Sequence, residues 1–180
     1  MFKRISTHGR WDIPKKEILK MYENFKENYS KNLLIAKELL KSNDLKFSLE
    51  EIDQFGEVYA ASHSNPEKLG LTYDELLDVF IVYYGEAWMY YFGGYWVYTT
   101  DKKVMHYGYP CIIDYGPPKE AWTGIPPHNY AYMLENQSKG LSYDDDFFSL
   151  SRIIKRHLDV YESQGVKNYK RTEREFFGKI

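Results

Sequence analysis

The segment from residue 73 to residue 92 constrains the fold more than any other part of the sequence, because as a helix it would be apolar around nearly its whole circumference. It follows Thr72-Tyr-Asp-Glu75, a capping box in which the Thr hydroxyl accepts from a backbone amide and the Glu side chain reaches back. It precedes Gly93-Gly94, which suits a left-handed helix end. A helix without a polar face must be covered on all sides. We therefore expect residues 73–92 to form a central, buried helix.

Four other segments have helical periodicity or helix-start signals. Apolar residues recur every three or four positions in the first of them, and Ser48-Leu-Glu-Glu51 is a second capping box at the start of the next. Asp144-Asp-Asp146 suits the start of the last, where carboxylates complement the helix dipole. The sequence predicts these helices over residues 14–42, 48–61, 128–139 and 147–164.

Between residues 95 and 113 the pattern changes to short β-branched and aromatic segments (95–98, 103–105 and 110–113) separated by turn residues. These segments predict a small antiparallel sheet, and the Gly- and Pro-rich residues 114–127 predict an irregular surface loop. The expected fold is α+β, with about five helices around a central buried helix (73–92) and a small antiparallel sheet (95–113). A length of 180 residues fits a single globular domain, 1–180, with a basic C-terminal tail over 165–180.

Several features bear on the compartment. Cys111 is the single cysteine, which fits a reducing environment and leaves no internal disulfide. No apolar run reaches the 18 or so residues that a membrane span needs, and the N-terminus lacks the apolar stretch of a signal peptide. We expect a cytoplasmic protein that has no membrane partner.

The charge is distributed unevenly along the chain. Residues 1–46 carry 11 basic and 6 acidic groups, residues 47–146 carry 5 and 16, and residues 147–180 carry 8 and 4. An acidic surface repels nucleic acid and attracts basic proteins, mainly by raising the association rate. The alternative interpretation is that the terminal helices simply have Lys-rich, solvated faces.

Motifs for metal, cofactor or nucleophilic chemistry are not evident. The five histidines, His8, His63, His106, His128 and His157, lack metal-ligand spacing, and Asp144-Asp-Asp146 lacks the Gly and Glu of a calcium loop. Cys111 lies in an apolar strand, where burial raises the pKa of a thiol and makes it inert. Gly93-Gly94 follows a helix and does not open one, so it does not form a phosphate loop. We expect no metal and no cofactor.

Two residues inside the apolar helix need an explanation. Gly85 costs about 1 kcal/mol relative to Ala in a helix, so we expect a close packing contact there. Glu86 is a carboxylate in an apolar setting. An unpaired carboxylate that is buried has a raised pKa, and a carboxyl group with a raised pKa can act as a general acid. The alternative interpretation is that Glu86 is paired and only fixes the packing.

Aromatic residues make up 18% of the chain, and 17 of the 32 lie between residues 73 and 132. Because this region is the acidic one, we expect no nucleic-acid binding. Tyr and Trp supply large, rigid contact areas at protein interfaces. Gly, Pro and polar neighbours favour exposure of five of these rings, and two carboxylates lie beside them. The candidate partner-binding residues are Tyr107, Tyr109, Asp114, Tyr115, Glu120, Trp122 and Tyr130, with Tyr115 and Trp122 as expected anchors.

The segment Tyr84-Gly-Glu-Ala-Trp-Met-Tyr-Tyr-Phe-Gly-Gly-Tyr-Trp96 resembles part of a group of small bacterial domains of unknown function, some of which look like toxin-immunity proteins. The likeness covers about residues 71–154. It implies a helix bearing Gly-Glu, a Gly-Gly stop and a strand that begins with Trp. The matching residues are Gly85, Glu86, Gly93, Gly94 and Trp96, which the resemblance marks as structural.

The resemblance and the acidic centre together predict a protein-binding inhibitor and not an enzyme. The expected form is an immunity protein that neutralises a basic bacterial toxin by stoichiometric binding through residues 106–146. A phage or bacterial regulatory module that acts against a defence system is the first alternative. An enzyme that uses Glu86 as acid or base is the second.

Overall fold

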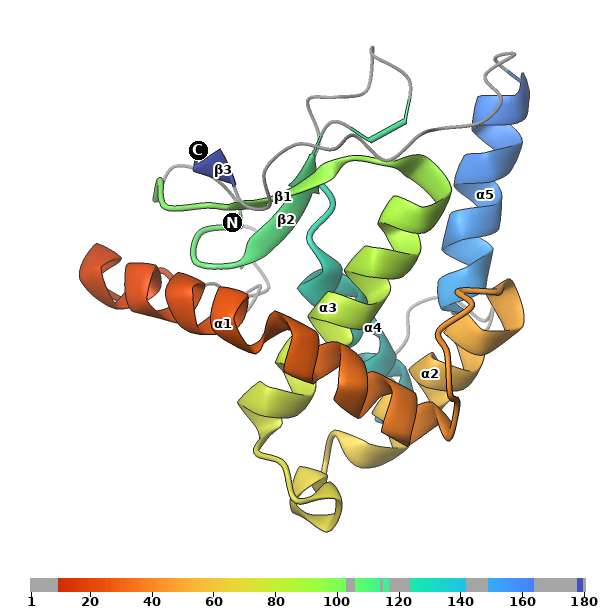
Figure 1. Ribbon diagram of the computed structural model, residues 1–180, viewed down its shortest axis with the longest axis horizontal. Coiled ribbons are helices and arrows are strands. Elements are labelled where there is room, and N and C mark those ends of the chain that lie inside the picture. Colours follow the sequence, from red (N-terminus) through yellow and green to blue (C-terminus); the bar gives the residue numbers. More distant parts are fainter. Residues whose placement is uncertain are drawn as a thin grey trace.

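The computed structural model describes residues 10–102, 106–113, 115–116, 124–141, 149–163 and 178–179. Five α-helices, one short 3-10 helix and three short strands form the described fold (Figure 1). The α+β class and the expected helices are confirmed. In chain order the elements are α1 (Lys15–Leu40), α2 (Leu49–Ser62), η1 (Pro66–Leu69), α3 (Tyr73–Phe92), β1 (Tyr95–Tyr98), β2 (Pro110–Ile113), α4 (Pro127–Ser138), α5 (Leu150–Ser163) and β3 (Gly178–Lys179).

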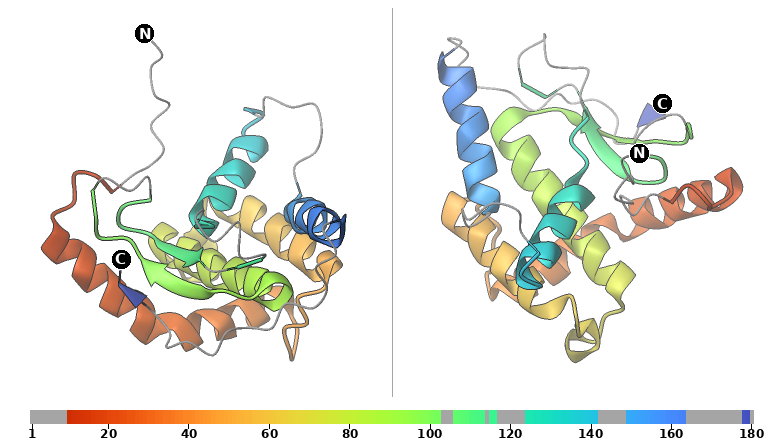
Figure 2. Two further views of the ribbon diagram at one scale, coloured as in Figure 1. Left: turned by 90° about the horizontal axis from the view of Figure 1, so that it is seen from above. Right: turned by 180° about the vertical axis from the view of Figure 1, so that it is seen from behind.

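Helix α3 is the centre of the fold, as its apolar sequence predicts. Helices α1 and α4 pack on opposite sides of it, which is seen most directly from above (Figure 2, left). Every α3 side chain from Leu76 to Met89 is buried except that of Asp78, which is partly buried. Because the helix has no polar face, covering it on both sides removes its apolar surface from water, and this burial is the main force that stabilises the fold.

Helices α2 and α3 begin where the two capping boxes in the sequence predict, but only the capping box of α3 is complete. Thr72 and Glu75 form the reciprocal capping box of α3, and Gly93 ends that helix with a φ of 70° that few residues other than glycine adopt. At α2 the Ser48 hydroxyl accepts from the Glu51 amide as expected. The Glu51 carboxylate, however, does not return to Ser48. It accepts instead from the amides of the two preceding loop residues and from a Tyr hydroxyl of α3.

The sheet lies beside the C-terminal end of α3. Strands β1 and β2 pair antiparallel, with Trp96 opposite Ile112, which confirms the expected sheet over 95–113. Strand β3 adds a parallel partner to β1 from the end of the basic tail, a pairing that the sequence did not indicate. The loop before α4 returns to the sheet through a bridge between Ile112 and Ile125. The expected strand 103–105, Asp144-Asp-Asp146 and residues 165–177 of the tail lie outside the described residues.

Gly85 explains how α3 and the sheet approach each other. A Cβ atom at this position would lie 2.1 Å from Cζ2 and Cη2 of Trp96. The close packing contact expected at Gly85 is therefore confirmed. The indole of Trp96 packs against α3 at Gly85, the one residue of that helix that has no side chain.

Candidate functional site

Three of the aromatic residues proposed as partner contacts are buried. The exposed fractions are 0% for Tyr107, 4% for Tyr109 and 3% for Tyr115. The prediction that these rings are exposed is wrong, and they do not offer a surface to a partner in this structure. Tyr130 is partly buried, with its ring centroid 5.0 Å from that of Tyr84. The other candidates, Asp114, Glu120 and Trp122, lie outside the described residues.

Contacts with distant segments explain why these tyrosines are covered. The Tyr107 ring stacks on Trp11, and its hydroxyl donates to the Ile13 carbonyl oxygen. The Tyr109 ring stacks on that of His128 at 3.8 Å, and the Arg10 guanidinium lies 4.2 Å above the same ring. Gly and Pro neighbours correctly indicate turns here, but the turns fold back onto the start of α1 and onto α4.

Glu86 is buried in a network of hydrogen bonds that joins three elements. Its carboxylate accepts from the hydroxyl of Tyr29 on α1, and that hydroxyl in turn accepts from the indole N–H of Trp96 at 2.9 Å. Glu86 is 8% exposed and lines none of the three depressions described below. These contacts favour the interpretation that Glu86 fixes the packing, with a phenol as its partner.

Cys111 is buried on β2, and burial raises the pKa of its thiol to about 12. The thiol therefore stays protonated at neutral pH, as its apolar neighbours led us to expect. The described residues contain no group of three or more His, Cys, Asp or Glu side chains arranged to hold a metal ion.

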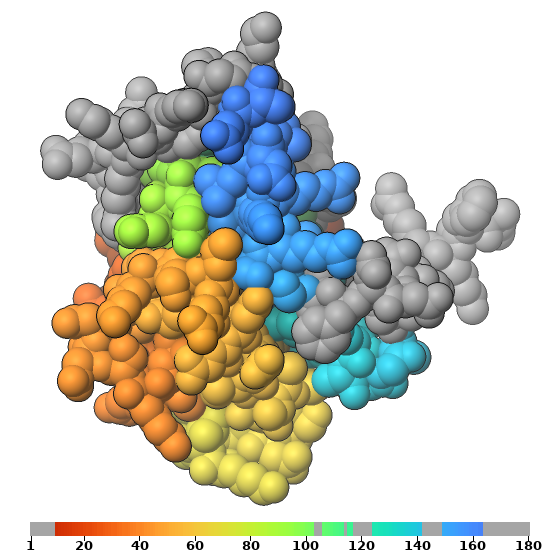
Figure 3. All heavy atoms as spheres, turned by 90° about the vertical axis from the view of Figure 1, so that its right-hand side faces the viewer, coloured from red at the N-terminus to blue at the C-terminus, as the bar shows by residue number. Residues whose placement is uncertain are grey.

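A groove lies where α2, α4 and the start of α5 meet, on the face shown in Figure 3. Its volume is about 440 Å³. Small and aliphatic residues form much of its lining, and carboxylates and polar side chains complete it. The described residues that line it are Asp53, Gly56, Glu57, Ala60, Leu134, Gln137, Ser138, Ser149 and Leu150.

The charge of this groove comes from α2, which carries four acidic residues and no basic ones. Asp53 already has hydrogen-bond partners, because it accepts from the backbone N–H of Ser151 at 2.9 Å and from that residue's hydroxyl. Glu57, one turn further along α2, is exposed at the rim. Among the lining residues that the structure describes, these two carry the only formal charges, and both are negative.

A second, more polar depression of about 620 Å³ lies beside the C-terminal ends of α2 and α4. Glu135 of α4 forms part of its wall, although its side chain is only 5% exposed. The hydroxyls of Tyr59 and Tyr73 both donate to Oε1 of this carboxylate, at 2.6 and 2.9 Å. The other described residues that line the depression are His63, Ser64, Tyr73, Tyr132 and Lys139. We call this feature the Glu135 depression.

Glu135 is not among the site residues predicted from the sequence, although the sequence contains a signal for its burial. The buried positions of α4 include His128, Ala131 and Leu134, and Glu135 follows Ala131 by four residues and so lies on the same helical face. A carboxylate at a core position of an amphipathic helix is the same signal that drew attention to Glu86.

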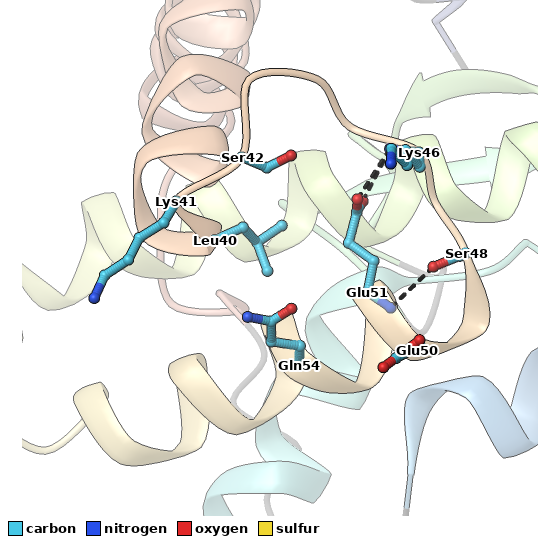
Figure 4. A pocket seen from close by; sticks show the side chains of 8 residues that line it. All are labelled: Leu40, Lys41, Ser42, Lys46, Ser48, Glu50, Glu51 and Gln54. Carbon is cyan, nitrogen blue, oxygen red and sulfur yellow. Dashed lines mark hydrogen bonds between the residues drawn. The ribbon is translucent and has the colours of Figure 1, made fainter.

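A third depression lies between the end of α1 and the start of α2 (Figure 4). Its central carboxylate, Glu51, accepts from the backbone N–H groups of Lys46 and Phe47 and from the hydroxyl of Tyr83. These bonds hold the α1–α2 loop against α3. The carboxylate is thus occupied by the fold, and this depression is a structural feature of the loop.

Asp78 is the one α3 side chain between residues 76 and 89 that is not fully buried, and it is partly withdrawn from water. Desolvation by burial raises the pKa of its carboxyl group to about 6, against an opposing effect of Arg10. A raised pKa means that the folded protein holds the proton more tightly than the unfolded chain does. The resulting stability is fully present below about pH 4 and is lost as the pH rises through about 6.

Asp78→Asn should therefore be more stable than the wild type at pH 7.5, by about 1–3 kcal/mol, and this gain should vanish near pH 4. The measurement is the free energy of unfolding of both proteins by urea from pH 4 to pH 8. Glu27→Gln, at an exposed position of α1, is the matched control and should show no comparable trend. A difference between wild type and D78N that stays constant across this range would contradict the prediction.

None of the helices in the described part of the chain is long and apolar enough to cross a membrane. A scan against protein-family models finds no match, and searches of the curated proteins and of the solved structures find none either.

Proposed function

We propose that this protein is a stoichiometric protein-binding inhibitor that captures a basic segment of its partner. The observation that carries this proposal is the groove between α2, α4 and α5, which has an apolar floor and a negative rim. Apolar surface supplies affinity when it is desolvated, and charges at a rim steer association. A segment with an apolar side chain flanked by Lys or Arg fits this chemistry.

The specific form that we propose is an immunity protein for a basic bacterial toxin. Its support is the likeness of residues 84–96 to small bacterial domains of unknown function, some of which look like toxin-immunity proteins, together with the acidic centre of the chain. A regulatory or anti-defence module would use the same groove for a different basic partner. An enzyme that uses Glu86 gains no support from the described depressions, because none of them is lined by Glu86.

Relative to the sequence-based prediction, the proposed surface moves. Tyr107, Tyr109 and Tyr115 are covered, so the contacts that we propose are the lining residues of the groove on α2 and α4. Trp122 remains a candidate anchor that lies outside the described residues. The expected dependence on a basic partner is unchanged, because the rim of the groove is acidic.

Glu57→Lys should slow association with the partner by about tenfold at low salt, because it replaces a negative rim charge with a positive one. The difference from wild type should shrink as ionic strength rises. The partner is first captured from the native host and identified, and binding kinetics are then measured with the purified pair. If the partner is a toxin, co-expression at equal levels should also restore growth of a toxin-producing strain.

Glu67→Lys is the matched control, because Glu67 is an exposed carboxylate of η1 that does not line the groove. It makes the same change in net charge and should alter association much less. Equal effects of the two variants would show that only net charge matters and would remove the groove from the proposal. A captured partner with an acidic binding surface would contradict the proposal as a whole.

A further inference from the structure

We propose that the Glu135 depression is a binding site for a primary ammonium group, such as the end of a lysine side chain. The site is separate from the groove and does not depend on the proposed function. It adjoins the groove, because Ser138 lines the groove and its hydroxyl lies 3.5 Å from Nε2 of His63, which lines the depression.

The first argument is the state of the Glu135 carboxylate. Both phenol donors, from Tyr59 and Tyr73, bind Oε1, and Oε2 has no hydrogen-bond partner among the described residues. Each carboxylate oxygen has capacity for about two donors. Oε2 is not among the fully enclosed unpaired side-chain atoms of the described residues, and Glu135 lines the depression. A nearly buried carboxylate thus presents an unused acceptor to this space.

The second argument is that the neighbouring groups are also acceptors. Burial and hydrogen bonding to Glu135 raise the pKa of Tyr59 and of Tyr73, so both phenols stay protonated. Each donates its hydroxyl proton in a hydrogen bond to the carboxylate. Their oxygens keep acceptor capacity. In His63, Nδ1 lies 2.8 Å from the Ala60 carbonyl oxygen, which can only accept. The neutral ring therefore carries its proton on Nδ1 and leaves the lone pair of Nε2 facing Ser64 and Ser138.

A site rich in acceptors and carrying a negative charge selects a cation that donates several hydrogen bonds. An ammonium group donates three, and the tyrosine rings that line the depression suit the apolar stem of a lysine. A metal ion is disfavoured, because the described residues around Glu135 do not include a second carboxylate or a ligand cluster. An anion is disfavoured, because the Glu135 carboxylate would repel it.

Lys139 is the one cation among the described residues that line the depression. Its side chain is exposed at the rim, and the single ion pair among the described residues, Lys37 with Asp44, does not involve it. It therefore does not neutralise Glu135 directly. Its positive charge should weakly repel an ammonium group bound in the depression and so lower the affinity, and salt should screen this repulsion.

The test is a titration followed by NMR, with Nα-acetyl-lysine N-methylamide as the probe and Nα-acetyl-norleucine N-methylamide, which keeps the alkyl stem but lacks the terminal ammonium, as its neutral control. The lysine probe should shift the amide signals of His63, Ser64, Glu135 and Lys139, and the norleucine probe should not. Glu135→Gln keeps a carbonyl oxygen for the two phenols but loses the charge, so it should weaken binding about tenfold or more.

Because Glu135→Gln can also disturb the fold, Lys139→Gln provides an independent measurement at an exposed position. It should tighten binding of the lysine probe about two- to threefold at low salt, with the gain falling as salt is added. The proposal is overturned if the norleucine probe binds as well as the lysine probe, if acetate binds at these residues instead, or if Lys139→Gln weakens binding. A folded E135Q protein with unchanged affinity would overturn it as well.

Discussion

Gly85→Ala should destabilise the protein by about 3 kcal/mol or more, although alanine is the better helix former by about 1 kcal/mol. The added methyl group would lie 2.1 Å from two atoms of the Trp96 ring, well inside van der Waals contact. The ring is rigid, and its N–H is held by the hydroxyl of Tyr29. Movement of the indole would therefore break the hydrogen-bonded chain that continues to Glu86.

Gly56→Ala provides the matched control, because Gly56 is a buried glycine inside a neighbouring helix. A Cβ atom there would lie 3.1 Å from Cδ1 of Leu150, the end of a flexible side chain. We expect a change within about 1 kcal/mol, since a small shift of Leu150 and the gain in helix propensity offset each other. Chemical denaturation of both variants measures the contrast. Similar stabilities of G85A and G56A would show that the Trp96 contact is not tight.

The part of the fold that the sequence predicts well is the part in which local and tertiary signals agree. Helix α3 has both a capping box and an apolar surface on all sides, so its position in the chain and its central place follow from the same residues. Gly85 is informative for a related reason. Glycine is unfavourable in a helix interior, and its presence there indicates a neighbour that needs the space.

The aromatic residues show where sequence reasoning fails. Tyr107 and Tyr109 lie next to Gly108, a turn residue, and turns are usually exposed. Their burial depends on Trp11 and Arg10, which are almost a hundred residues away in the chain. Nothing in the local pattern of a turn reports whether a distant segment will cover it.

The two depressions were not predictable for the same physical reason. The groove takes residues from α2, α4 and α5, and the Glu135 depression takes them from α3, α4 and the segments that follow α2 and α4, so each exists only after the helices have packed. The sequence does indicate the acidic character of α2, and helical spacing places Glu135 on a buried face. Tertiary packing alone decides which carboxylates accept hydrogen bonds from tyrosine hydroxyls.

Trp88→Ala should lower the free energy of unfolding by about 3–5 kcal/mol, which is a large part of the 5–15 kcal/mol that stabilises a typical domain. The indole is fully buried and contacts Phe92, Tyr115 and His157, with ring centroids 4.6, 5.4 and 4.9 Å away. It therefore joins α3 to α5 and to the segment after β2. Truncation to alanine leaves a cavity between α3, α5 and the segment after β2. These three cannot all move in to fill it, so the lost packing contacts are not replaced.

Two further substitutions separate lost packing from other effects. Trp88→Phe should cost clearly less than Trp88→Ala, because it keeps an aromatic ring and because the buried indole N–H has no hydrogen-bond partner among the described residues. Tyr90→Ala, on the same helix but 62% exposed, should change stability by no more than about 1 kcal/mol. Urea unfolding of the three variants would rank them W88A, W88F and Y90A in decreasing cost. A W88A protein as stable as Y90A would mean that α3 is not the centre of the core.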